Sequence, residues 1–308
     1  MNNKGIILIS GGTGLIGKQL SERLHLAGYN VAILSTRSSL RSIYPVYYLD
    51  VRNRNIEPHL PAQIDQVIHL AGANIGEKRW TKKRKLEIID SRVQTAQIIL
   101  EVVQNQDVKI KTFISTSAIG YYGMVTSNKI FRETDEPGND FLAKTCLLWE
   151  QAADEFEKLG VRTVKIRTGL VLSGYGGALK RMIAPIKFGV SIFFGKGTQW
   201  MPWIHIDDLC SIYIKAIEDN QMQGAYNAVA PHHITNTDFS KELRQEVVTP
   251  SILLKLPLFF LKIIFGEMAG IFLYGSRVSS EKIEKAGFEF KFSRLDFALK
   301  NLLIIINL

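Results

Sequence analysis

Short apolar runs alternate with longer amphipathic stretches over the first half of the chain. The amphipathic stretches, most clearly 80–104 and 141–159, carry apolar residues at helical spacing. The apolar runs are typical of strands buried on both faces of a parallel sheet, and they lie at 5–10, 30–34, 46–51, 66–70, 111–116 and 161–167. This alternation predicts an α/β protein with a Rossmann-type, doubly wound parallel sheet and a ligand site at the carboxyl ends of the strands.

The pattern changes after about Thr168. Short strands and helices, interrupted by Gly and Pro, predict a smaller, mixed C-terminal lobe that closes over the ligand. The expected division is a dinucleotide-binding Rossmann domain at 1–168 and a substrate lobe at 169–308. A later segment, about 205–230, is expected to return to the first domain.

One stretch, 250–273, is apolar enough to compare with a membrane span. It is interrupted by Lys255, Pro257, Lys262 and Glu267, whereas a spanning helix needs about 20 consecutive, mostly apolar residues. A helical pair that is buried or faces a partner is therefore expected, without stable membrane insertion. Peripheral contact with a membrane is the alternative.

A glycine-rich turn follows the first apolar run directly. Gly11, Gly14 and Gly17 are three residues apart, which allows a tight turn, close approach of a diphosphate and packing of the next helix on the strand. An ordinary strand–turn–helix corner is the alternative, but the position between a strand and an amphipathic helix favours dinucleotide binding. The residues expected to contact the cofactor here are Gly11, Thr13, Gly14, Leu15, Ile16 and Gly17.

The end of the second run indicates which nicotinamide cofactor is used. An NAD enzyme usually has an acidic residue about 20 residues after the glycines, to bind the ribose hydroxyls. This chain has Ser35, Thr36 and Arg37, with Arg41 a turn later. An arginine beside hydroxyl groups suits a 2′-phosphate, so NADP is expected rather than NAD. The alternative is that these are plain loop residues.

Further cofactor contacts are expected where the third and fourth runs end. Asp50 is placed either to reach the adenine edge or to cap the following turn. The small residues after the fourth run would let the ribose and diphosphate lie against the backbone at Leu70, Ala71 and Gly72.

Charge and composition argue against several other classes of protein, nucleic-acid binders among them. The 308 residues carry a net charge of +9, and the basic run at 78–85 has neither a nucleic-acid-binding module nor a series of aromatic residues around it. A solvated helix start, or one facing a small anion, is the simpler interpretation. Two cysteines and a first strand close to the N-terminus predict a reducing compartment, the cytoplasm, with no signal peptide. His205, Asp207 and Asp208 have no ligand from a third segment, so no metal site is expected.

Ten motifs occur along the chain in a specific order. They are SGGTGLIG at 10–17, HLAGANI at 69–75, KRWTKKRK at 78–85, SAIGYYG at 117–123, WE at 149–150, RTGLVL at 167–172, GGAL at 176–179, GKGTQWMPWIHIDDL at 195–209, NAVAP at 227–231 and GSRVSSEKIEKAGFEF at 275–290. With them the chain resembles the extended short-chain dehydrogenase/reductase superfamily. The match is closer to an atypical, epimerase-like subgroup, sometimes labelled cell-division-inhibitor-like, that carries its own C-terminal domain. The resemblance implies an NADP-binding Rossmann domain, a substrate lobe and a backbone contact to the cofactor near Arg167, but no particular substrate.

The resemblance also exposes a departure at the expected catalytic residues. The superfamily uses a Ser, a Tyr and a Lys four residues after the Tyr. Aligning Glu150 with the family's helical glutamate puts Leu142 at the Tyr position and Cys146 at the Lys position, so the Tyr-x-x-x-Lys pair is absent. Ser117 matches the serine, and the candidate phenols, with loop packing as their alternative role, are Tyr121 and Tyr122. Lys144 or His205 could supply charge.

Three other positions have two possible roles each. Gln199 and Trp200 either touch the substrate or belong to the core, and Arg92 either lies at the pocket floor or forms a surface salt bridge. Asp207 and Asp208 are expected to be structural, with Asp208 capping the helix that starts near Leu209.

Two functions from different classes fit these features. The first is an NADP-dependent oxidoreductase or epimerase-like enzyme acting on a small molecule. The second is a catalytically inactive NADP-binding regulator or scaffold, and a nucleic-acid or membrane-surface binder is a third and weaker hypothesis. The sequence leaves the oligomeric state open.

Overall fold

A single large sheet organises the first part of the molecule. The computed structural model describes residues 4–37, 39–247 and 249–306. Eight strands are hydrogen-bonded in the order β12-β8-β6-β5-β1-β2-β3-β4, and every pair is parallel except β3 with β4. Their bounds are β1 Ile6–Ser10, β2 Asn30–Ser35, β3 Val46–Asp50, β4 Asn55–Glu57, β5 Gln63–His69, β6 Lys109–Ala118, β8 Arg162–Thr168 and β12 Gly224–Ala228. The predicted Rossmann-type parallel sheet is confirmed.

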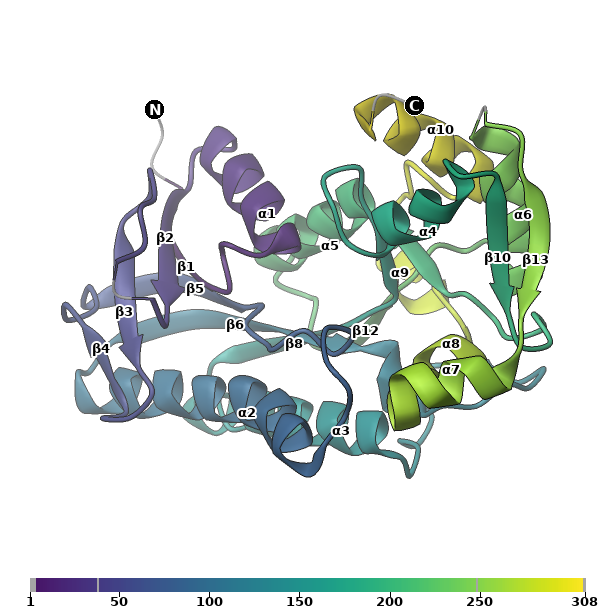
Figure 1. The fold of residues 1–308 in the computed structure, drawn as a ribbon. Coiled ribbons are helices and arrows are strands. Elements are labelled where there is room, and N and C mark those ends of the chain that lie inside the picture. Colours follow the sequence, from purple (N-terminus) through teal and green to yellow (C-terminus); the bar gives the residue numbers. More distant parts are fainter. Residues whose placement is uncertain (1–3, 38, 248, 307–308) are drawn as a thin grey trace.

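Helices cover both faces of this sheet (Figure 1). Helices α1 (Leu15–Leu26) and α5 (Ile206–Glu218) lie on one face, and α2 (Lys82–Asn105) and α3 (Phe141–Asp154) lie on the other. Ile7 and Ile9 of β1 belong to the core under α1 and α5, whereas Leu8 belongs to the core under α2 and α3. Successive side chains of a strand point to opposite faces, so a wholly apolar strand suits a sheet covered on both sides.

The register of the central strands brings the predicted cofactor segments together. Ser10, the last residue of β1, pairs with Leu34 of β2 on one side and with His69 of β5 on the other. The segments that follow these three strands therefore leave the sheet at the same edge. These segments are the glycine turn, residues 35–37 and residues 70–73.

Two strands of the sheet lie outside the six predicted runs. The three-residue strand β4 closes one edge, antiparallel to β3, and β12 closes the other edge beside β8. The segment predicted to return to the sheet contains both α5 and β12. The helix predicted at 141–159 ends earlier, at Asp154, and a 3-10 turn follows at Glu157–Leu159.

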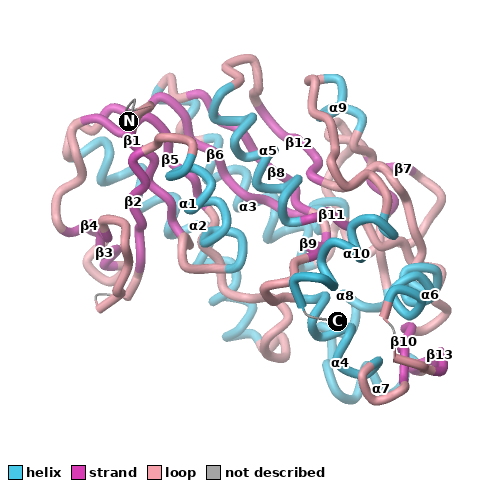
Figure 2. Tube along the Cα trace, turned by 90° about the horizontal axis from the view of Figure 1, so that it is seen from above, coloured by secondary structure: helices cyan, strands magenta, loops and turns pink. Residues whose placement is uncertain are grey.

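The C-terminal part is built from short elements at one end of the sheet (Figure 2). Three two-stranded sheets pair β10 with β13, β11 with β9, and β14 with β7. The strands are β7 Ile130–Phe131, β9 Leu170–Leu172, β10 Val190–Phe194, β11 Trp203–His205, β13 Ile252–Leu256 and β14 Arg277–Val278. The helices are α4 Ala178–Ile186, α6 Asn236–Glu246, α7 Leu258–Phe265, α8 Gly270–Leu273, α9 Glu281–Lys285 and α10 Leu295–Ile306.

The segment at 250–273 differs from the predicted helical pair. It begins with strand β13, which pairs with β10, and continues through Pro257 into α7 and the short α8. Most of α7 is exposed, with only Leu261 buried. Among the described residues, no helix is both long and apolar enough to cross a membrane.

The C-terminal chain is attached to α5 by Asp208. Its carboxylate accepts hydrogen bonds from the backbone N–H groups of Lys291 (3.0 Å) and Phe292 (2.9 Å), and burial raises the pKa of Asp208. Asp208 lies inside α5 and binds the C-terminal chain, so its predicted role as the cap of this helix is wrong. The cap of α5 is His205, whose Nδ1 accepts from the N–H of Asp207 at 3.0 Å.

Candidate functional site

The glycine turn is held closely against the neighbouring strand and against its own helix. Gly11 has a φ of +74°, and a Cβ there would lie 2.8 Å from the backbone nitrogen of Ala71. A Cβ on Gly17 would lie 2.4 Å from the carbonyl oxygen of Gly11. Both positions therefore require glycine for close approach, and Gly11 requires it for its backbone conformation as well.

The start of α1 is open and carries no side-chain cap. Gly14 is the N-cap residue, and the first turn contains no acidic residue. The first N–H groups of a helix, here those of Leu15, Ile16 and Gly17, have no acceptor within the helix. Within the described part of the chain, a Cβ on Gly14 would have only the Gly11 carbonyl oxygen within 4 Å, at 3.2 Å. This combination of free N–H groups and open space suits a diphosphate.

The predicted 2′-phosphate segment lies at the end of β2. The Ser35 hydroxyl accepts a hydrogen bond from the N–H of Arg37 at 3.0 Å, and the side chains of Thr36 and Arg37 are exposed. A hollow of about 290 Å³ lies beside the turn and is lined in part by Thr13, Lys18 and Arg41. The cations Lys18 and Arg41 and the Thr13 hydroxyl can donate to a phosphate, and the same lining also contains the carboxylate of Glu22.

Two roles were predicted for Asp50, and its hydrogen bonds match the capping of the following turn. Its Oδ1 accepts from the N–H groups of Arg52 and Asn53, both at 3.0 Å, and its Oδ2 accepts from the Asn53 side chain at 2.8 Å. These hydrogen bonds, those of Asn53 most strongly, lower the pKa of Asp50. The carboxylate thus stabilises the turn between β3 and β4.

The loop after β5 rests on two side chains of α2. The Ser91 hydroxyl accepts from the N–H of Ala73 (2.9 Å), and Arg92 donates to the carbonyl oxygens of Ala73 (3.2 Å) and Ile88 (2.8 Å). A Cβ on Gly72 would lie 2.8 Å from the Arg92 guanidinium carbon, so the loop packs directly on this group.

Arg92 is a largely buried cation behind this loop. Its guanidinium carbon lies 4.9 Å from the ring centre of Trp149, and no carboxylate of the described residues forms a salt bridge with it. Burial lowers the pKa of Arg92 to about 10. Within the described residues, Arg92 therefore does not form the surface salt bridge that was considered for it. Its guanidinium lies under the Gly72–Ala73 loop.

His69, the last residue of β5, is fully buried beneath the same loop. Its Nε2 lies 3.0 Å from the Arg92 carbonyl oxygen, and its Nδ1 lies 2.7 Å from the Ser10 hydroxyl. Because the carbonyl can only accept, Nε2 donates, and in the neutral ring that burial favours Nδ1 accepts from the Ser10 hydroxyl. Burial lowers the pKa of His69 to about 4.

We expect this histidine to make the protein lose stability in mild acid. The unfolded chain binds a proton at His69 below its ordinary pKa of 6.5, whereas the folded protein does so only at about 4. As the pH falls through this window, the free energy of unfolding falls by up to about 3 kcal/mol from this group. His205 contributes in the same direction, because burial lowers its pKa to about 4.

Urea unfolding at several pH values between 7 and 4.5 measures this effect. The His69→Asn variant is expected to show a shallower pH dependence than the unmodified protein. The matched control is His59→Asn, which removes an exposed histidine and should leave the dependence unchanged. Equal slopes for all three proteins would contradict the assignment to His69.

Leu142 and Cys146 stand at the positions of the family's Tyr and Lys, and both make apolar contacts. A Cβ on Gly120 would lie 3.4 Å from Leu142 Cβ and 3.6 Å from Cys146 Sγ, so both side chains face the segment after β6. Burial raises the pKa of the Cys146 thiol to about 12. Neither side chain can supply the acid–base group that the superfamily has here.

Ser117 and Tyr122 both belong to a buried network around an ion pair. The Arg167 guanidinium donates to both carboxylate oxygens of Glu150 at 2.8 and 2.9 Å, and the Ser117 hydroxyl donates to the same carboxylate at 2.7 Å. Tyr122 accepts from Arg167 at 3.1 Å and donates to Asn227 at 2.7 Å. All of these residues are at most 5% exposed. Ser117 and Tyr122 therefore have protein partners and do not face an open site.

Tyr121 is the accessible one of the two phenols. Its ring centre lies 3.5 Å from the guanidinium carbon of Arg167, and its side chain is partly exposed. Burial raises the pKa of Tyr121, while the Arg167 charge opposes that rise. The Arg167 side chain was not predicted to take part in this arrangement, since only a backbone contact was expected near it.

The remaining candidates lie apart from this group. Gln199 is buried and donates to the carbonyl oxygens of Phe194 (3.1 Å) and Phe272 (2.7 Å), which is a structural role. The Trp200 indole donates to the Ser127 carbonyl oxygen at 3.0 Å. Lys144 is exposed on α3. Among the described residues, no group of three or more His, Cys, Asp or Glu side chains could hold a metal ion.

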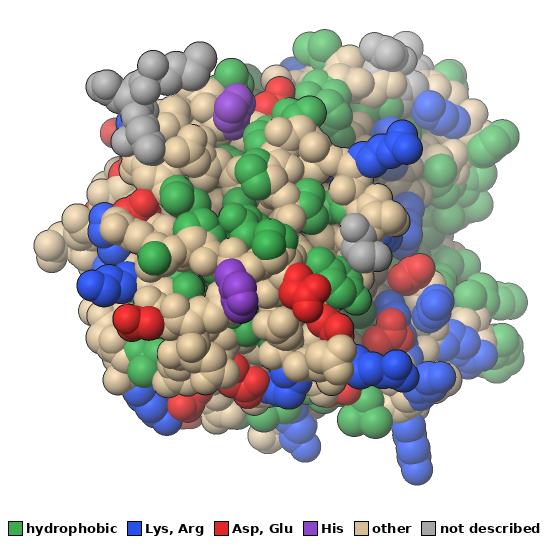
Figure 3. Space-filling model, turned by 90° about the vertical axis from the view of Figure 1, so that its left-hand side faces the viewer, with side chains coloured by type: hydrophobic (Ala, Val, Ile, Leu, Met, Phe, Trp, Pro, Cys, Tyr) green, Lys and Arg blue, Asp and Glu red, His purple; other side chains and the backbone are tan. Residues whose placement is uncertain are grey.

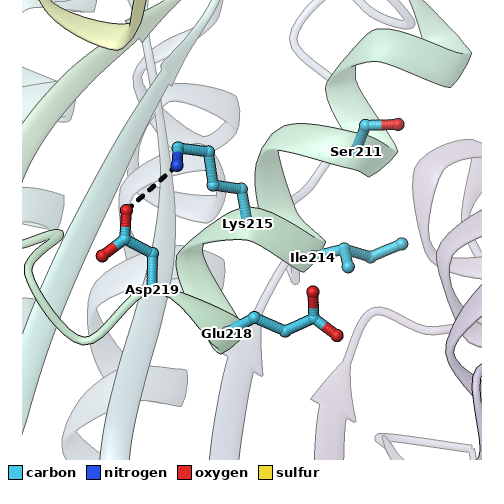
Figure 4. Close-up of a pocket in the computed structure, with 5 residues that line it drawn as sticks. All are labelled: Ser211, Ile214, Lys215, Glu218 and Asp219. Atoms are coloured by element: carbon cyan, nitrogen blue, oxygen red, sulfur yellow. Dashed lines mark hydrogen bonds and ion pairs between the residues drawn. The ribbon is translucent and has the colours of Figure 1, made fainter. Parts of the chain in front are cut away.

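A second hollow, of about 390 Å³, lies on α5 (Figure 4). It is bordered by Lys215 and Asp219, whose side chains form an ion pair at 3.0 Å. Glu218 at this end of the helix contacts Lys4 and Tyr29, which precede β1 and β2. The hollow therefore lies at the amino ends of the strands, opposite the glycine turn, and it has no part in the candidate site.

Charged side chains of both signs are distributed over the surface. On the face shown in Figure 3, basic and acidic side chains are interspersed. Within the basic run, Arg84 is buried and paired with Glu77 and Glu87, and Lys85 is paired with Glu267 of the C-terminal part. Part of this run is thus structural. For Lys85 the sequence could not show this, because its partner Glu267 lies far along the chain.

The family can be stated from a comparison with known proteins. Residues 7–229 match the NAD dependent epimerase/dehydratase family. The chain belongs to this family. As an epimerase family member it has the NAD(P)-binding fold of the short-chain dehydrogenase/reductases, in agreement with the sheet and the glycine turn. Residues 256–302 match a further domain of unknown function, DUF1731, as the resemblance to the atypical subgroup predicted.

Relatives in this epimerase family match over nearly their whole length. Epimerase family protein YfhF of Bacillus subtilis is 35% identical over 299 residues, covering 96% of this chain and 97% of that protein. The crystal structure of human epimerase family protein SDR39U1 with NADPH has 28% identity and a TM-score of 0.85, covering 96% of this chain and 98% of that one. UDP-N-acetylglucosamine 4-epimerase from Bacillus cereus, at 16% identity and a TM-score of 0.77, shares the fold.

Proposed function

We propose that this epimerase family protein is an NADP-dependent oxidoreductase or epimerase-like enzyme that acts on a small molecule. The observation that carries the proposal is the open, uncapped start of α1 beside a glycine turn that packs against β5. When bound there, the cofactor would supply or accept a hydride. The residues proposed to hold it are Gly11, Thr13, Gly14, Leu15, Ile16, Gly17, Ser35, Thr36, Arg37, Leu70, Ala71 and Gly72.

NADP is proposed over NAD because of the side chains at the end of β2. Arg37 follows β2 at the sheet edge where the glycine turn lies, and Arg41 lines the hollow beside that turn. No acidic residue stands among 35–37 to bind the ribose hydroxyls. The related human protein was solved with NADPH, which supports the same choice. Arginine can donate two parallel hydrogen bonds to a phosphate, and these are among the stronger hydrogen bonds in proteins.

Arg37→Glu is expected to weaken NADPH binding about tenfold to a hundredfold, because it removes a charge-assisted hydrogen bond and adds a repulsion. NADH has no 2′-phosphate, so its affinity should change little. Fluorescence titration with both cofactors measures the two constants. Arg244→Glu, at an exposed arginine of α6, is the charge-matched control. Equal losses for NADPH and NADH in Arg37→Glu would contradict the role of Arg37.

We propose Tyr121 as the residue that meets the substrate oxygen. It remains accessible, whereas Ser117 and Tyr122 are engaged in the network around Glu150 and Arg167. The guanidinium under the Tyr121 ring would stabilise a phenolate when the phenol gives up its proton. Ser117 then acts through the network, as a positioning residue.

A panel of carbonyl compounds and nucleotide sugars, followed at the NADPH absorbance, tests this assignment. Tyr121→Phe is expected to lower turnover at least tenfold with unchanged NADPH affinity, because general acid–base groups contribute about 100-fold or more. Tyr48→Phe, on β3, is the matched control. Full turnover in Tyr121→Phe would exclude this phenol from the chemistry.

The second candidate function is a regulator or scaffold that binds NADP without catalysis. Leu142 and the inert thiol of Cys146 at the usual Tyr and Lys positions favour it. Tight NADPH binding with no oxidation over the whole panel would support this second function. The free thiols of Cys146 and Cys210 fit a reducing compartment, which supports the cytoplasm as the proposed location.

A further inference from the structure

Helix α7 exposes nearly its whole apolar surface. Its sequence is LFFLKIIF, and Leu261 is its only buried residue. A helix that is apolar on all sides is normally covered. The exposed fractions of its large side chains are 44% for Leu258, 67% for Phe259, 52% for Phe260 and 55% each for Ile263 and Ile264.

Strand β13 adds to the same surface through the short link at Pro257. Ile252 and Leu254, two residues apart on one face of the strand, are 61% and 46% exposed. Figures 1 and 2 place α7 and β13 at the outer edge of the C-terminal part. We call the exposed side chains of β13 and α7 the α7 surface. A continuous apolar surface of this kind normally marks an interaction site.

The charged residues within the segment that forms the α7 surface are all basic. Residues 250–265 contain Lys255 and Lys262 and no acidic residue, and both lysines are exposed. Cations of this kind flank apolar surfaces that lie on anionic bilayers.

The basic run at the start of α2 lies next to this segment. Lys85 is paired with Glu267 at 2.6 Å, and a Cβ on Gly266 would lie 3.1 Å from the Arg79 guanidinium. These contacts place Arg79 and the start of α2 beside the end of α7. The same run carries three further exposed cations, Lys78, Lys82 and Lys83. The apolar helix is therefore bordered by cations from two distant parts of the sequence.

We propose that the α7 surface docks on the face of an anionic phospholipid bilayer, with α7 lying in the plane of the interface. Its exposed Phe and Ile side chains would enter the boundary between head groups and acyl chains, and the lysines would contact the lipid phosphates. Eight residues span about 12 Å, which is too short to cross the hydrocarbon core of about 30 Å.

Charge favours the bilayer over a second copy of the chain as the partner. A twofold contact places the same patch on both subunits, so the cations around one α7 would face those around the other. Repulsion between like charges opposes that contact, whereas anionic lipid neutralises them. An anionic bilayer would bury the apolar side chains of α7 and would also neutralise the cations beside them.

Docking would also set the orientation of the candidate site. Phe265, at the end of α7, and Met268 pack in one apolar cluster with Ala73 and Leu142. The α7 surface is therefore continuous with the side chains around the loop after β5. A protein held at the bilayer by α7 would keep this loop at a fixed distance from the lipid.

Vesicle flotation of the full chain tests the proposal. Vesicles of phosphatidylcholine with 30% phosphatidylglycerol are expected to retain the protein at low ionic strength, and pure phosphatidylcholine vesicles to retain at least tenfold less. The double variant Phe259→Ser/Phe260→Ser should lose at least tenfold in partitioning. Lys262→Glu should lose about fivefold or more, since each cation near the surface contributes about 1 kcal/mol.

Matched controls lie elsewhere on the molecule. Phe297→Ser replaces an exposed aromatic residue of α10, and Lys109→Glu replaces an exposed lysine at the start of β6. Both should partition like the unmodified protein. Unchanged NADPH affinity and melting temperature in all variants show that the fold is intact.

Three results would overturn the proposal. They are no retention by anionic vesicles, equal retention of Phe259→Ser/Phe260→Ser and Phe297→Ser, and a dimer by light scattering that the double variant converts to monomer. The third result would assign the α7 surface to self-association.

Discussion

Gly14→Val is expected to abolish NADPH binding, with a loss of at least a hundredfold, while the protein stays folded. Gly14 has a φ of −73°, which valine tolerates, and among the described residues its Cβ position has one atom within 4 Å, the Gly11 carbonyl oxygen at 3.2 Å. The added methyl groups would occupy the space in front of the first N–H groups of α1, where a diphosphate is proposed to lie. Titration with NADPH and thermal melting measure the two effects separately.

Gly160→Ala is the control with the opposite expected outcome. Gly160 has a φ of +75°, and no atom of the described residues lies within 4 Å of its Cβ position, so alanine there costs about 1 kcal/mol in backbone strain without a steric clash. We expect a lower melting temperature and unchanged NADPH affinity. If Gly14→Val binds NADPH normally, the cofactor does not lie on α1.

Arg167→Leu is expected to destabilise the protein by about 3–5 kcal/mol, because it leaves the buried Glu150 carboxylate without its ion-pair partner. The guanidinium and carboxylate side chains are 4% and 6% exposed. Tyr122 would lose a donor in the same variant. Chemical unfolding in urea measures the difference directly.

The chain contains a matched surface pair for comparison. Arg54 binds Glu101 in the same two-pronged geometry, but both side chains are 42% exposed. Exposed ion pairs contribute at most about 1 kcal/mol, so Arg54→Leu should have a small effect. Replacing Glu150 and Arg167 together by leucine should restore part of the stability lost in Arg167→Leu. Equal losses of unfolding free energy in Arg54→Leu and Arg167→Leu would show that burial does not make the Arg167–Glu150 pair more important for stability than the exposed pair.

The features that the sequence predicted correctly are local ones. The glycine turn depends on steric contacts within a few residues and on one neighbouring strand, so its spacing alone indicates its conformation. The six buried strands follow from apolar runs that need no particular partner. The two missed strands were missed for different reasons. Strand β4 pairs with the neighbouring β3 but has only three residues, too few to show a pattern, whereas β13 is a strand because the distant β10 lies beside it.

The surroundings of the candidate catalytic residues also depend on distant parts of the chain, which the sequence pattern does not show. Ser117 lies at the end of β6, where the resemblance places a reactive serine, and Tyr122 lies in the 3-10 turn that follows at Ile119–Tyr122. Their orientations are set by Glu150, Arg167 and Asn227, which come from α3, β8 and β12. Sequence spacing could not show that these five side chains satisfy one another in the interior. A buried acidic residue on α3 and an arginine ending a buried strand were the available signals.

Equilibrium titration of the unmodified protein with NADPH and with NADH tests the central claim most directly. We predict saturable binding of one NADPH per chain, at least tenfold tighter than NADH, because Arg37 is proposed to bind the 2′-phosphate. Equal affinity for the two cofactors, or no binding of either, would contradict an NADP site at the glycine turn.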